Sequence, residues 1–241
     1  MFESNRIKNK IKSADMSRWW GDDFDVRFYL ISRIKHFQRK KILDVGGGIG
    51  IISSEMNYNN IRINLDLSFN DLKICQKNID KKIDVVCGSM TNLPFKEEVF
   101  DAIICSNLLE EAKKIDIEKE SNIEKSLSNY PTIEKTLEEI RNILKKNGIL
   151  YLTTPNNKYY NTIKLTFQEL HCTLNKKFSE VEIYFFNTYP KLGNNRKLNF
   201  ANIIPKLKSK ISNPDKIIQK LIKTKSKCDY SVSFYVEAKN G

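Results

Sequence analysis

The chain has 241 residues, 40% of them hydrophobic and 29% charged, as expected for one large globular domain. No apolar run approaches the ~18 residues of a membrane-spanning helix, and the N-terminus lacks the apolar core of a secretory signal. The net charge is +12, and residues 191–227 alone hold eleven Lys or Arg against one acidic residue. The five cysteines are scattered without a CxxC pair, so we expect no zinc site, no disulfide framework and a reducing, cytoplasmic compartment.

Helical patterns and short apolar runs alternate along the chain. Residues 1–40 have helical spacing and are expected to form an N-terminal cap. Strands are predicted at 41–45, 61–66, 83–87, 100–105, 149–153, 181–186 and 230–236. Helices are predicted at 67–79 and, after the fifth strand, around 166–171. This alternation predicts an α/β fold with a parallel, doubly wound sheet, in which ligands bind beyond the carboxyl ends of the strands.

The stretch between the fourth and fifth strands is the least regular. Residues 112–130 are charged and lack a clear period, so we expect a loop or a poorly anchored helix. Pro131 is suited to start the next helix and Gly148 to stop it. The predicted apolar face of that helix consists of Ile133, Leu137, Ile140, Ile143 and Leu144.

A glycine-rich turn, Gly46–Gly50, follows the first predicted strand. It does not fit the dinucleotide pattern G-x-G-x-x-G, whose last position would fall on Ile51 or Ser53, and no lysine follows as in a P-loop. It does fit D-x-G-x-G-x-G, in which Asp44 closes the strand. Because this carboxylate would repel a pyrophosphate, the turn suits a ligand that carries an ammonium group and no phosphate.

Five sequence blocks between residues 40 and 156 have the order and spacing of the class I S-adenosylmethionine-dependent methyltransferases, which this chain resembles. The closest resemblance is to the small-molecule and lipid-precursor enzymes of methyltransferase type 11. It implies a Rossmann-like, doubly wound sheet of seven strands, mostly parallel with an antiparallel last strand, and helical cap elements. The blocks are 42–50, Asp66, 87–95, 100–110 and 137–156, the last of which ends in Thr154-Pro155-Asn156.

The resemblance implies that the core, residues 41–156, binds S-adenosylmethionine. Asp44 would attract the ammonium group of the cofactor, and Asp66 would accept hydrogen bonds from both ribose hydroxyls. Leu67 would pack on the adenine. The complete set of expected cofactor-binding residues is Asp44, Gly46, Gly48, Gly50, Asp66, Leu67, Ser89, Met90, Ser106 and Asn107.

Some positions depart from the pattern of the family. Ser89, expected with Met90 at the adenine edge, stands where the family often has an acid. Ser106 and Asn107 would flank the sulfonium and the acceptor. The related Leu-Glu-His pattern has Glu111 in place of the histidine. These departures leave the acceptor open.

The catalytic residues also stay open at this stage. Glu111 and His171 are candidates for a general base, which only a hydroxyl acceptor requires. For each of them a position on the solvated surface is the alternative. No metal site is expected.

We predict a single domain over residues 1–241 that methylates an O or N nucleophile of a small or lipid-linked acceptor. The basic segment 191–227, an insertion between the last two strands, suits an anionic membrane surface, so the protein could be peripheral to a membrane. It equally suits nucleic acid. The alternative functions are therefore an RNA or protein methyltransferase and a non-catalytic methyltransferase-like binding module. For the basic segment itself, the alternative is a solvated lid helix made lysine-rich by codon bias.

Overall fold

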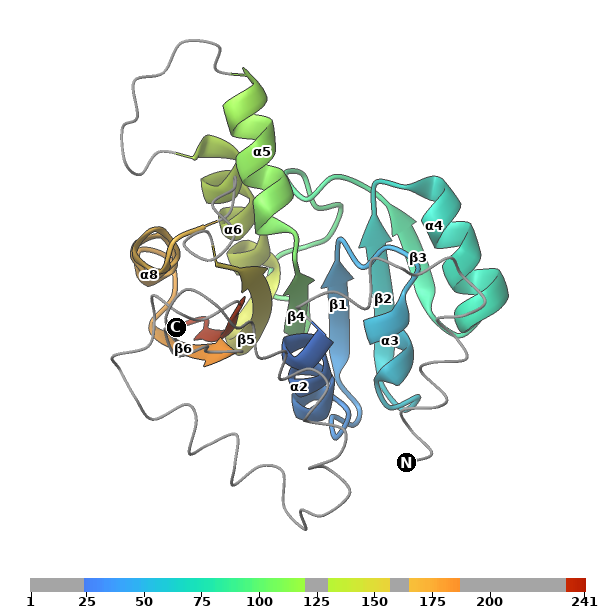
Figure 1. Cartoon of the computed structure of the whole chain (residues 1–241). Helices are drawn as coiled ribbons and strands as arrows, with labels where there is room; N and C mark the ends of the chain where they lie inside the picture. The colour runs from blue at the N-terminus through green and yellow to red at the C-terminus, as the bar shows by residue number, and fades with distance from the viewer. Residues whose placement is uncertain (1–23, 120–129, 157–164, 187–232) are drawn as a thin grey trace, which may run out of the picture.

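The computed structural model describes residues 24–119, 130–156, 165–186 and 233–241. This part of the chain forms a seven-stranded sheet with the order β3-β2-β1-β4-β5-β7-β6 (Figure 1). β1 to β5 pair in parallel, and β7 runs antiparallel to β5 and β6. The predicted sheet, including its antiparallel last strand, is confirmed. The strands are β1 (Lys41–Val45), β2 (Ile61–Asp66), β3 (Asp84–Cys87), β4 (Phe100–Ser106), β5 (Leu144–Pro155), β6 (Glu180–Phe186) and β7 (Ser233–Lys239).

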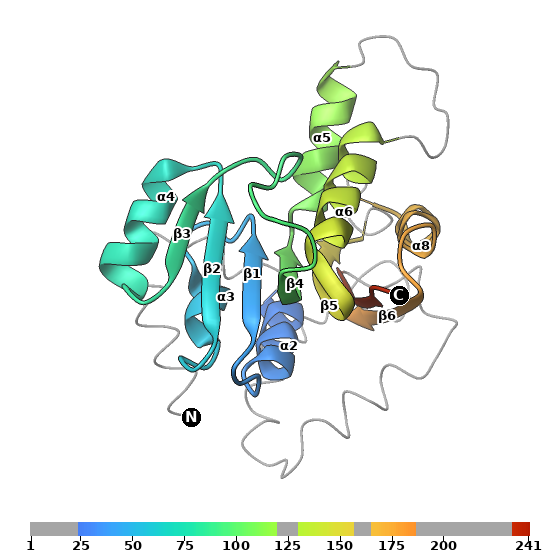
Figure 2. The same cartoon turned by 180° about the vertical axis from the view of Figure 1, so that it is seen from behind.

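Helices cover both faces of the sheet (Figures 1 and 2). α2 (Phe24–Ile34) and α3 (Ile51–Glu55) share one apolar cluster with the sheet. α5 (Leu109–Lys119), α6 (Pro131–Ile143) and α8 (Phe167–Asn175) share the other. Alternate side chains of the buried strand β1 belong to the two apolar clusters, because successive side chains of a strand point to opposite faces. Leu43 and Val45 face α5 and α6, whereas Ile42, and therefore Asp44, face α2 and α3.

The helix predicted at 67–79 is shorter and in two parts. α4 (Phe69–Ile74) begins after Ser68, whose side chain accepts a hydrogen bond from the Asp71 N–H at 3.3 Å. A π-helical turn, η2 (Cys75–Ile79), follows it. Leu67 therefore lies outside the helix.

α5 corrects the expectation of a loop or a poorly anchored helix after residue 112. Ala112, Lys113 and Asp116 are at most 4% exposed. The Asp116 carboxylate accepts hydrogen bonds from the backbone N–H of Thr132, at 3.0 and 3.1 Å, and from its hydroxyl. It thereby caps the N-terminus of α6, where backbone N–H groups lack helical partners. The partner lies on another helix, so the local pattern did not reveal it. Residues 120–129 of the predicted loop lie outside the described residues.

The boundary between α6 and β5 was also predicted wrongly. α6 ends at Ile143, and Leu144, predicted as part of the apolar face of the helix, is the first residue of β5; its side chain nevertheless lies in the same apolar core as that face. Gly148 lies within β5 and does not end the helix. It is a glycine because a Cβ there would lie 2.8 Å from the carbonyl oxygen of Lys145.

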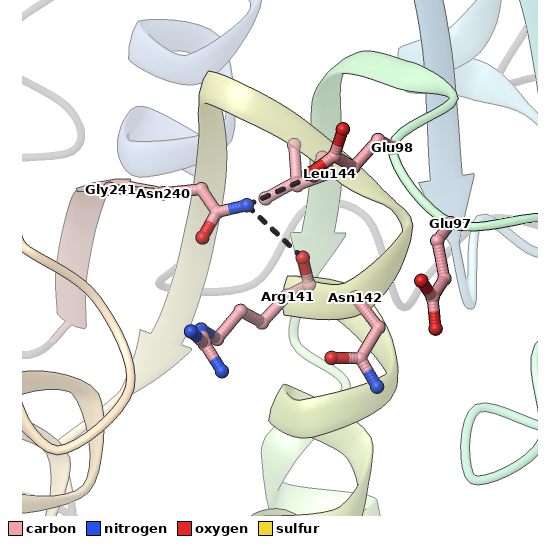
Figure 3. Close-up of a pocket in the computed structure, with 7 residues that line it drawn as sticks. All are labelled: Glu97, Glu98, Arg141, Asn142, Leu144, Asn240 and Gly241. Atoms are coloured by element: carbon pink, nitrogen blue, oxygen red, sulfur yellow. Dashed lines mark hydrogen bonds between the residues drawn. The ribbon is translucent and has the colours of Figure 1, made fainter.

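The end of α6 is closed by segments distant in sequence. The Asn240 side chain donates to the carbonyls of Arg141 and Leu144 at 3.2 and 2.9 Å (Figure 3). The backbone N–H groups of Glu98 and Val99 donate hydrogen bonds to the two carbonyls that lie between Arg141 and Leu144 in the chain. A pocket of about 180 Å³ lies beside this junction, lined by Glu97, Glu98, Arg141, Asn142, Leu144, Asn240 and Gly241. It sits at the amino ends of β4 and β5, away from the edge where ligands of such sheets bind.

Several expectations fall on residues outside the described ranges. Residues 1–23 of the predicted N-terminal cap and the whole basic insertion 191–227 belong to this group. Within the described ranges, no helix has the length and apolar character needed to cross a membrane.

Candidate active site

The expected cofactor residues gather at the carboxyl ends of β1, β2, β3 and β4. β1 pairs with β2 on one side and with β4 on the other, so the strand order reverses direction between β1 and β4. Such a switch point is where doubly wound sheets bind ligands. Asp44, Asp66 and Ser106 stand at the ends of their strands, at the edge to which the arrowheads of β1 and β2 point in Figure 1.

The glycine turn after β1 is held by hydrogen bonds that its N–H groups donate to the neighbouring strand. The N–H groups of Gly46 and Gly47 donate to the Leu65 carbonyl at 2.8 and 3.3 Å. The Gly48 N–H donates to Asp66 Oδ2 at 2.8 Å. Gly48 has a φ of 53°, a left-handed conformation that other residues adopt only at a cost. The turn is therefore formed by the protein itself, before any ligand contact is considered.

Asn64 lies beneath this turn and was not expected as a site residue. It is fully buried, and its Nδ2 donates to the Gly48 carbonyl at 2.8 Å. A Cβ on Gly47 would lie 2.2 Å from Asn64 Oδ1, so the carboxamide also explains why Gly47 lacks a side chain. The available signal was an amide between two apolar residues, Ile63 and Leu65, of a predicted strand, since buried polar groups need partners.

Asp44 lies next to Asn64 on the same face of the sheet, because the two residues pair across β1 and β2. Asp44 is 1% exposed, and its Oδ2 accepts a hydrogen bond from the Ser53 hydroxyl at 2.8 Å. Burial raises the pKa of Asp44 to about 7; the Ser53 hydrogen bond opposes this shift and the charge of Asp66 adds to it. Oδ1 of Asp44 and Oδ1 of Asn64 have no hydrogen-bond donor within the described part of the chain.

These two buried acceptors fit an ammonium group. A buried carboxylate needs a donor or an opposite charge, and an amide oxygen beside it adds a second acceptor. The acid Asp44, expected from the sequence to meet the cofactor ammonium, therefore has the required chemistry. The structure adds Asn64 as a neighbour that the sequence did not reveal.

Each carboxylate oxygen of Asp66 accepts a hydrogen bond from the backbone of the protein itself. Oδ2 accepts from the Gly48 N–H and Oδ1 from the Ser68 N–H, both at 2.8 Å. Each carboxylate oxygen has two lone pairs, so both can still accept from ribose hydroxyls. Leu67, the next residue, is 75% exposed. An apolar side chain this exposed beside the predicted ribose site offers a surface for an adenine ring.

The third strand contributes the other expected adenine contacts. The hydroxyls of Ser89 and Thr91 are 3.0 Å apart, so Ser89 is held in a short turn. Met90 is partly buried and packs on the core cluster of β4 and α6. Both residues are near the end of β3, which pairs with β2. Their contacts with a ligand stay predictions.

The ends of β4 and β5 carry a second set of polar groups. The hydroxyls of Ser106 and Thr153 are 2.9 Å apart, and Thr153 donates to Asn107 Oδ1 at 3.2 Å. The Asn107 N–H donates to the Thr153 carbonyl at 2.8 Å, and its φ is 54°. Thr154 donates to Glu110 Oε2 at 3.4 Å. Ser106 and Asn107 thus lie where the sequence places them, on the strand that pairs with β1 and directly after it.

The two candidates for a general base, Glu111 and His171, are more exposed than this set of polar groups. Glu111 is exposed on α5, while the preceding Glu110 is partly buried. His171 is exposed on α8, with its ring centroid 5.5 Å from that of Phe167. No side-chain contact of either candidate with the residues at the strand ends is found in the described part of the chain.

A buried ionic cluster connects the helices next to this edge. Glu169 of α8 accepts hydrogen bonds from Lys113 Nζ of α5 at 3.0 Å and from the Tyr130 hydroxyl at 2.9 Å. Its other oxygen closes a capping box with Thr166. Burial opposes the charge of Glu169, yet the hydrogen bonds from Thr166 and Lys113 lower its pKa. The cluster fixes α8 against α5 beyond the ends of β4 and β5.

The strand order with its antiparallel β7, the glycine turn after β1 and the acid at the end of β2 define a class I methyltransferase fold. Residues 43–152 match the family model described as a methyltransferase domain, a range that runs from β1 into β5. These residues form a methyltransferase type 11 domain, and the protein is an S-adenosylmethionine-dependent methyltransferase.

One relative and several solved structures are similar to this chain over most of its length. An uncharacterized protein of Methanocaldococcus jannaschii is 29% identical over 205 residues, which cover 80% of this chain and 78% of the relative. The N-methyltransferase NodS of Bradyrhizobium japonicum, solved with S-adenosylhomocysteine, superposes with a TM-score of 0.59 at 11% identity, covering 98% of this chain and 97% of NodS.

Two further solved structures share the fold, and one of them is not a methyltransferase by its description. Phosphoethanolamine N-methyltransferase 2 of Haemonchus contortus, solved with S-adenosylmethionine, has a TM-score of 0.52 at 15% identity over 90% of this chain and 52% of that one. The [4+2]-cyclase SpnF has a TM-score of 0.53 at 14% identity, over 90% of this chain and 80% of its own. Because a cyclase shares the fold, the sheet by itself does not determine the chemistry.

Proposed function

We propose that the protein transfers the methyl group of S-adenosylmethionine to an O or N nucleophile of a small or lipid-linked acceptor. The observation that supports the cofactor site best is the pair of buried oxygens, on Asp44 and Asn64, beneath a glycine turn held by Asp66. The match of residues 43–152 to a methyltransferase domain supports the same site.

In this proposal the residues at the carboxyl ends of the strands each contact one part of the cofactor. Asp44 and Asn64 accept hydrogen bonds from the ammonium group, Asp66 accepts from the ribose hydroxyls, and Leu67 packs on the adenine. When bound, the cofactor supplies a methyl group already activated on a positively charged sulfur. The protein then has to hold the acceptor in line with that methyl group, and such alignment contributes several kcal/mol to the rate.

The small acceptor is supported by two of the structural neighbours. Both NodS and the Haemonchus contortus enzyme are described as N-methyltransferases, and the second is named for phosphoethanolamine. We further propose that the chain is one domain and that segment 191–227 adds contacts to an anionic surface. The eleven basic residues of that segment support this second part.

Titration calorimetry with S-adenosylmethionine, S-adenosylhomocysteine and NAD tests the cofactor site. Wild-type protein should bind the first two and not NAD. Asp66→Asn should weaken binding about 10- to 100-fold, because hydrogen bonds to a charged group contribute about 1.5–3 kcal/mol. Asp84→Asn is the matched control, since Asp84 is exposed at the opposite end of β3.

Equal loss in both variants, or no binding by folded wild type, would contradict the proposed cofactor site and favour a non-catalytic module. Co-sedimentation with anionic liposomes and with RNA over a salt series separates the acceptor classes. Binding to RNA alone, lost as salt rises, would favour an RNA methyltransferase.

A further inference from the structure

Two buried oxygen atoms beneath the glycine turn lack a hydrogen-bond donor. Asp44 and Asn64 pair across β1 and β2, and they are 1% and 0% exposed. Oδ1 of each residue has no hydrogen-bond partner within the described part of the chain. Buried polar atoms are rarely left in this state, because each has given up its hydrogen bond to water. One hydrogen atom is therefore missing between two acceptors.

The orientation of the Asn64 amide is fixed by its other contacts. Nδ2 donates to the Gly48 carbonyl at 2.8 Å, and a carbonyl can accept only from the NH₂ end of the amide. Burial raises the pKa of the Cys75 thiol, and a second hydrogen bond from Asn64 opposes that shift. Turning the amide over would set Oδ1 against the Gly48 carbonyl. Oδ1 therefore stays on the side of Gly47 and Asp44.

The amide oxygen and the carboxyl group meet at one point beneath the turn. A Cβ on Gly47 would lie 2.2 Å from Asn64 Oδ1 and 2.7 Å from both Cγ and Oδ2 of Asp44. The Ser53 hydroxyl donates to Asp44 Oδ2 at 2.8 Å, so one of the two carboxyl oxygens has a donor. Two acceptors placed in this way repel each other, and the repulsion becomes attraction when the carboxyl group carries a hydrogen.

The titratable groups that face Asp44 favour its neutral form. Burial raises the pKa of Asp44 to about 7; the hydrogen bond from Ser53 opposes this shift and the charge of Asp66 on β2 adds to it. The thiols of Cys75 on η2 and Cys105 on β4 are within reach of the Asp44 charge, and burial raises the pKa of both. The helices α2 and α3 contribute apolar side chains and Ser53 to this face.

The buried cation on the same face of the sheet does not compensate Asp44. Arg62 lies two residues before Asn64 on β2, and its side chain is 2% exposed. Its Nη1 donates to Oδ2 of Asp80, the residue after η2, at 2.9 Å. No cation of the described ranges contributes to the pKa of Asp44. A buried carboxyl without an opposite charge avoids the cost of ionisation by taking up a proton.

From this arrangement we infer that Asp44 is a neutral acid that donates its hydrogen to Asn64 Oδ1 in the cofactor-free protein, and that cofactor binding expels this proton. Only the second part rests on the proposed function. The ammonium group of the cofactor brings hydrogens and a positive charge to the two oxygens, which stabilises the ionised carboxyl. The proton passes from Asp44 to water, one for each cofactor bound. Each pH unit below about 7 should therefore weaken cofactor binding about tenfold.

A carboxyl titration of the cofactor-free protein tests the neutral acid without any ligand. The aspartate carboxyls are labelled with ¹³C, and their chemical shifts are followed by NMR as the pH is varied. We expect one signal with a midpoint near 7, absent from Asp44→Asn and retained in Asp84→Asn, the matched exposed control. If every aspartate carboxyl titrates below about pH 5, Asp44 is ionised and the inference is overturned.

Two further variants test the hydrogen bond through the sign of their effects. Asn64→Ala removes the acceptor of the neutral acid and should lower the Asp44 midpoint, whereas Ser53→Ala removes a donor to the ionised form and should raise it. Each shift should be about 0.5–1 pH unit. Water entering a loosened site would lower the midpoint in both variants, because it favours the charged form. Shifts in the same direction would therefore overturn the hydrogen bond, and a lower midpoint in Ser53→Ala does so even if Asn64→Ala fails to fold.

Calorimetry with S-adenosylhomocysteine, which carries the same ammonium group, tests the expulsion of the proton. Binding heats in two buffers of different ionisation enthalpy should give about 0.9 released protons at pH 6 and about 0.5 at pH 7, for wild type and Asp84→Asn alike. In the complex at pH 6, the Asp44 carboxyl signal should move to its ionised position. Equal heats in the two buffers would overturn the linkage. If wild type does not bind although Asp44 titrates near 7, the proposed function fails and the expulsion with it, whereas the neutral acid is retained.

Discussion

Substitution of Gly47 by alanine would introduce a methyl group for which the site has no room. The new Cβ would lie 2.2 Å from Asn64 Oδ1 and 2.7 Å from Asp44 Oδ2, whereas real Cβ contacts are essentially never below 3.0 Å. Both neighbours are buried and held: Asn64 donates to the Gly48 carbonyl and Asp44 accepts from Ser53, each at 2.8 Å. One of these side chains must move, so at least one buried hydrogen bond is strained or lost.

The magnitude follows from these two effects. Overpacking a rigid site costs about 1–3 kcal/mol, and a buried group left without its hydrogen-bond partner costs about 1–3 kcal/mol. We expect Gly47→Ala to lower the free energy of unfolding by about 3 kcal/mol. Gly48→Ala should cost less, about 1–2 kcal/mol. Its Cβ would lie 4.0 Å from Asp66 Oδ2, an ordinary contact distance, so only the left-handed φ is unfavourable there.

A double-mutant cycle identifies the cause. Urea unfolding followed by circular dichroism is measured for wild type, Gly47→Ala, Asn64→Ala and the double variant. With Asn64 truncated, the alanine at position 47 meets only Asp44, so its cost should fall by about 1–2 kcal/mol, within the usual range for coupled neighbours. Costs that add within about 0.5 kcal/mol would refute the steric role of Asn64.

Two further predictions concern the neighbouring acid and the adenine surface. The pKa of Asp44 is raised to about 7 in the folded protein, so its ionisation destabilises the fold progressively as pH rises from about 4 to 7. Asp44→Asn should therefore be more stable relative to wild type at pH 8 than at pH 5 in urea unfolding without cofactor, and a pH-independent difference would contradict the buried carboxyl. Leu67→Ala should leave the free energy of unfolding within about 0.5 kcal/mol, because Leu67 is 75% exposed. It should nevertheless weaken S-adenosylhomocysteine binding about 5-fold in calorimetry, the effect of losing about 1 kcal/mol of apolar burial; unchanged affinity would exclude Leu67 from the adenine site.

The central strands were predictable because their signals are local. β1 and β2 have the predicted bounds, 41–45 and 61–66, since β1 is a short apolar run closed by the glycine-rich turn and β2 alternates apolar and polar residues up to Asp66. The glycine turn and Asp66 were found for the same reason. Their hydrogen bond, from the Gly48 N–H to Asp66 Oδ2, joins two motifs that the sequence had already singled out.

The boundary of α6 shows where local signals fail. Leu144 continues the apolar period of the helix, yet it begins β5. The last carbonyls of α6 are satisfied by Asn240 and by the N–H groups of Glu98 and Val99. Since these partners come from distant parts of the chain, the helix ends earlier than its own sequence predicts.

The amino-acid sequence by itself determined the α/β class, the glycine turn and the positions of Asp44 and Asp66 at the ends of the first two strands. These features depend on the order of apolar and turn-forming residues, which act over a few positions of the chain. The tertiary structure decided the rest: Asn64 beneath the turn, the cap of α6 by Asp116, and the different surroundings of Glu110 and Glu111. Each of these depends on an atom that another strand or helix brings within hydrogen-bond distance, and no local pattern encodes that distance.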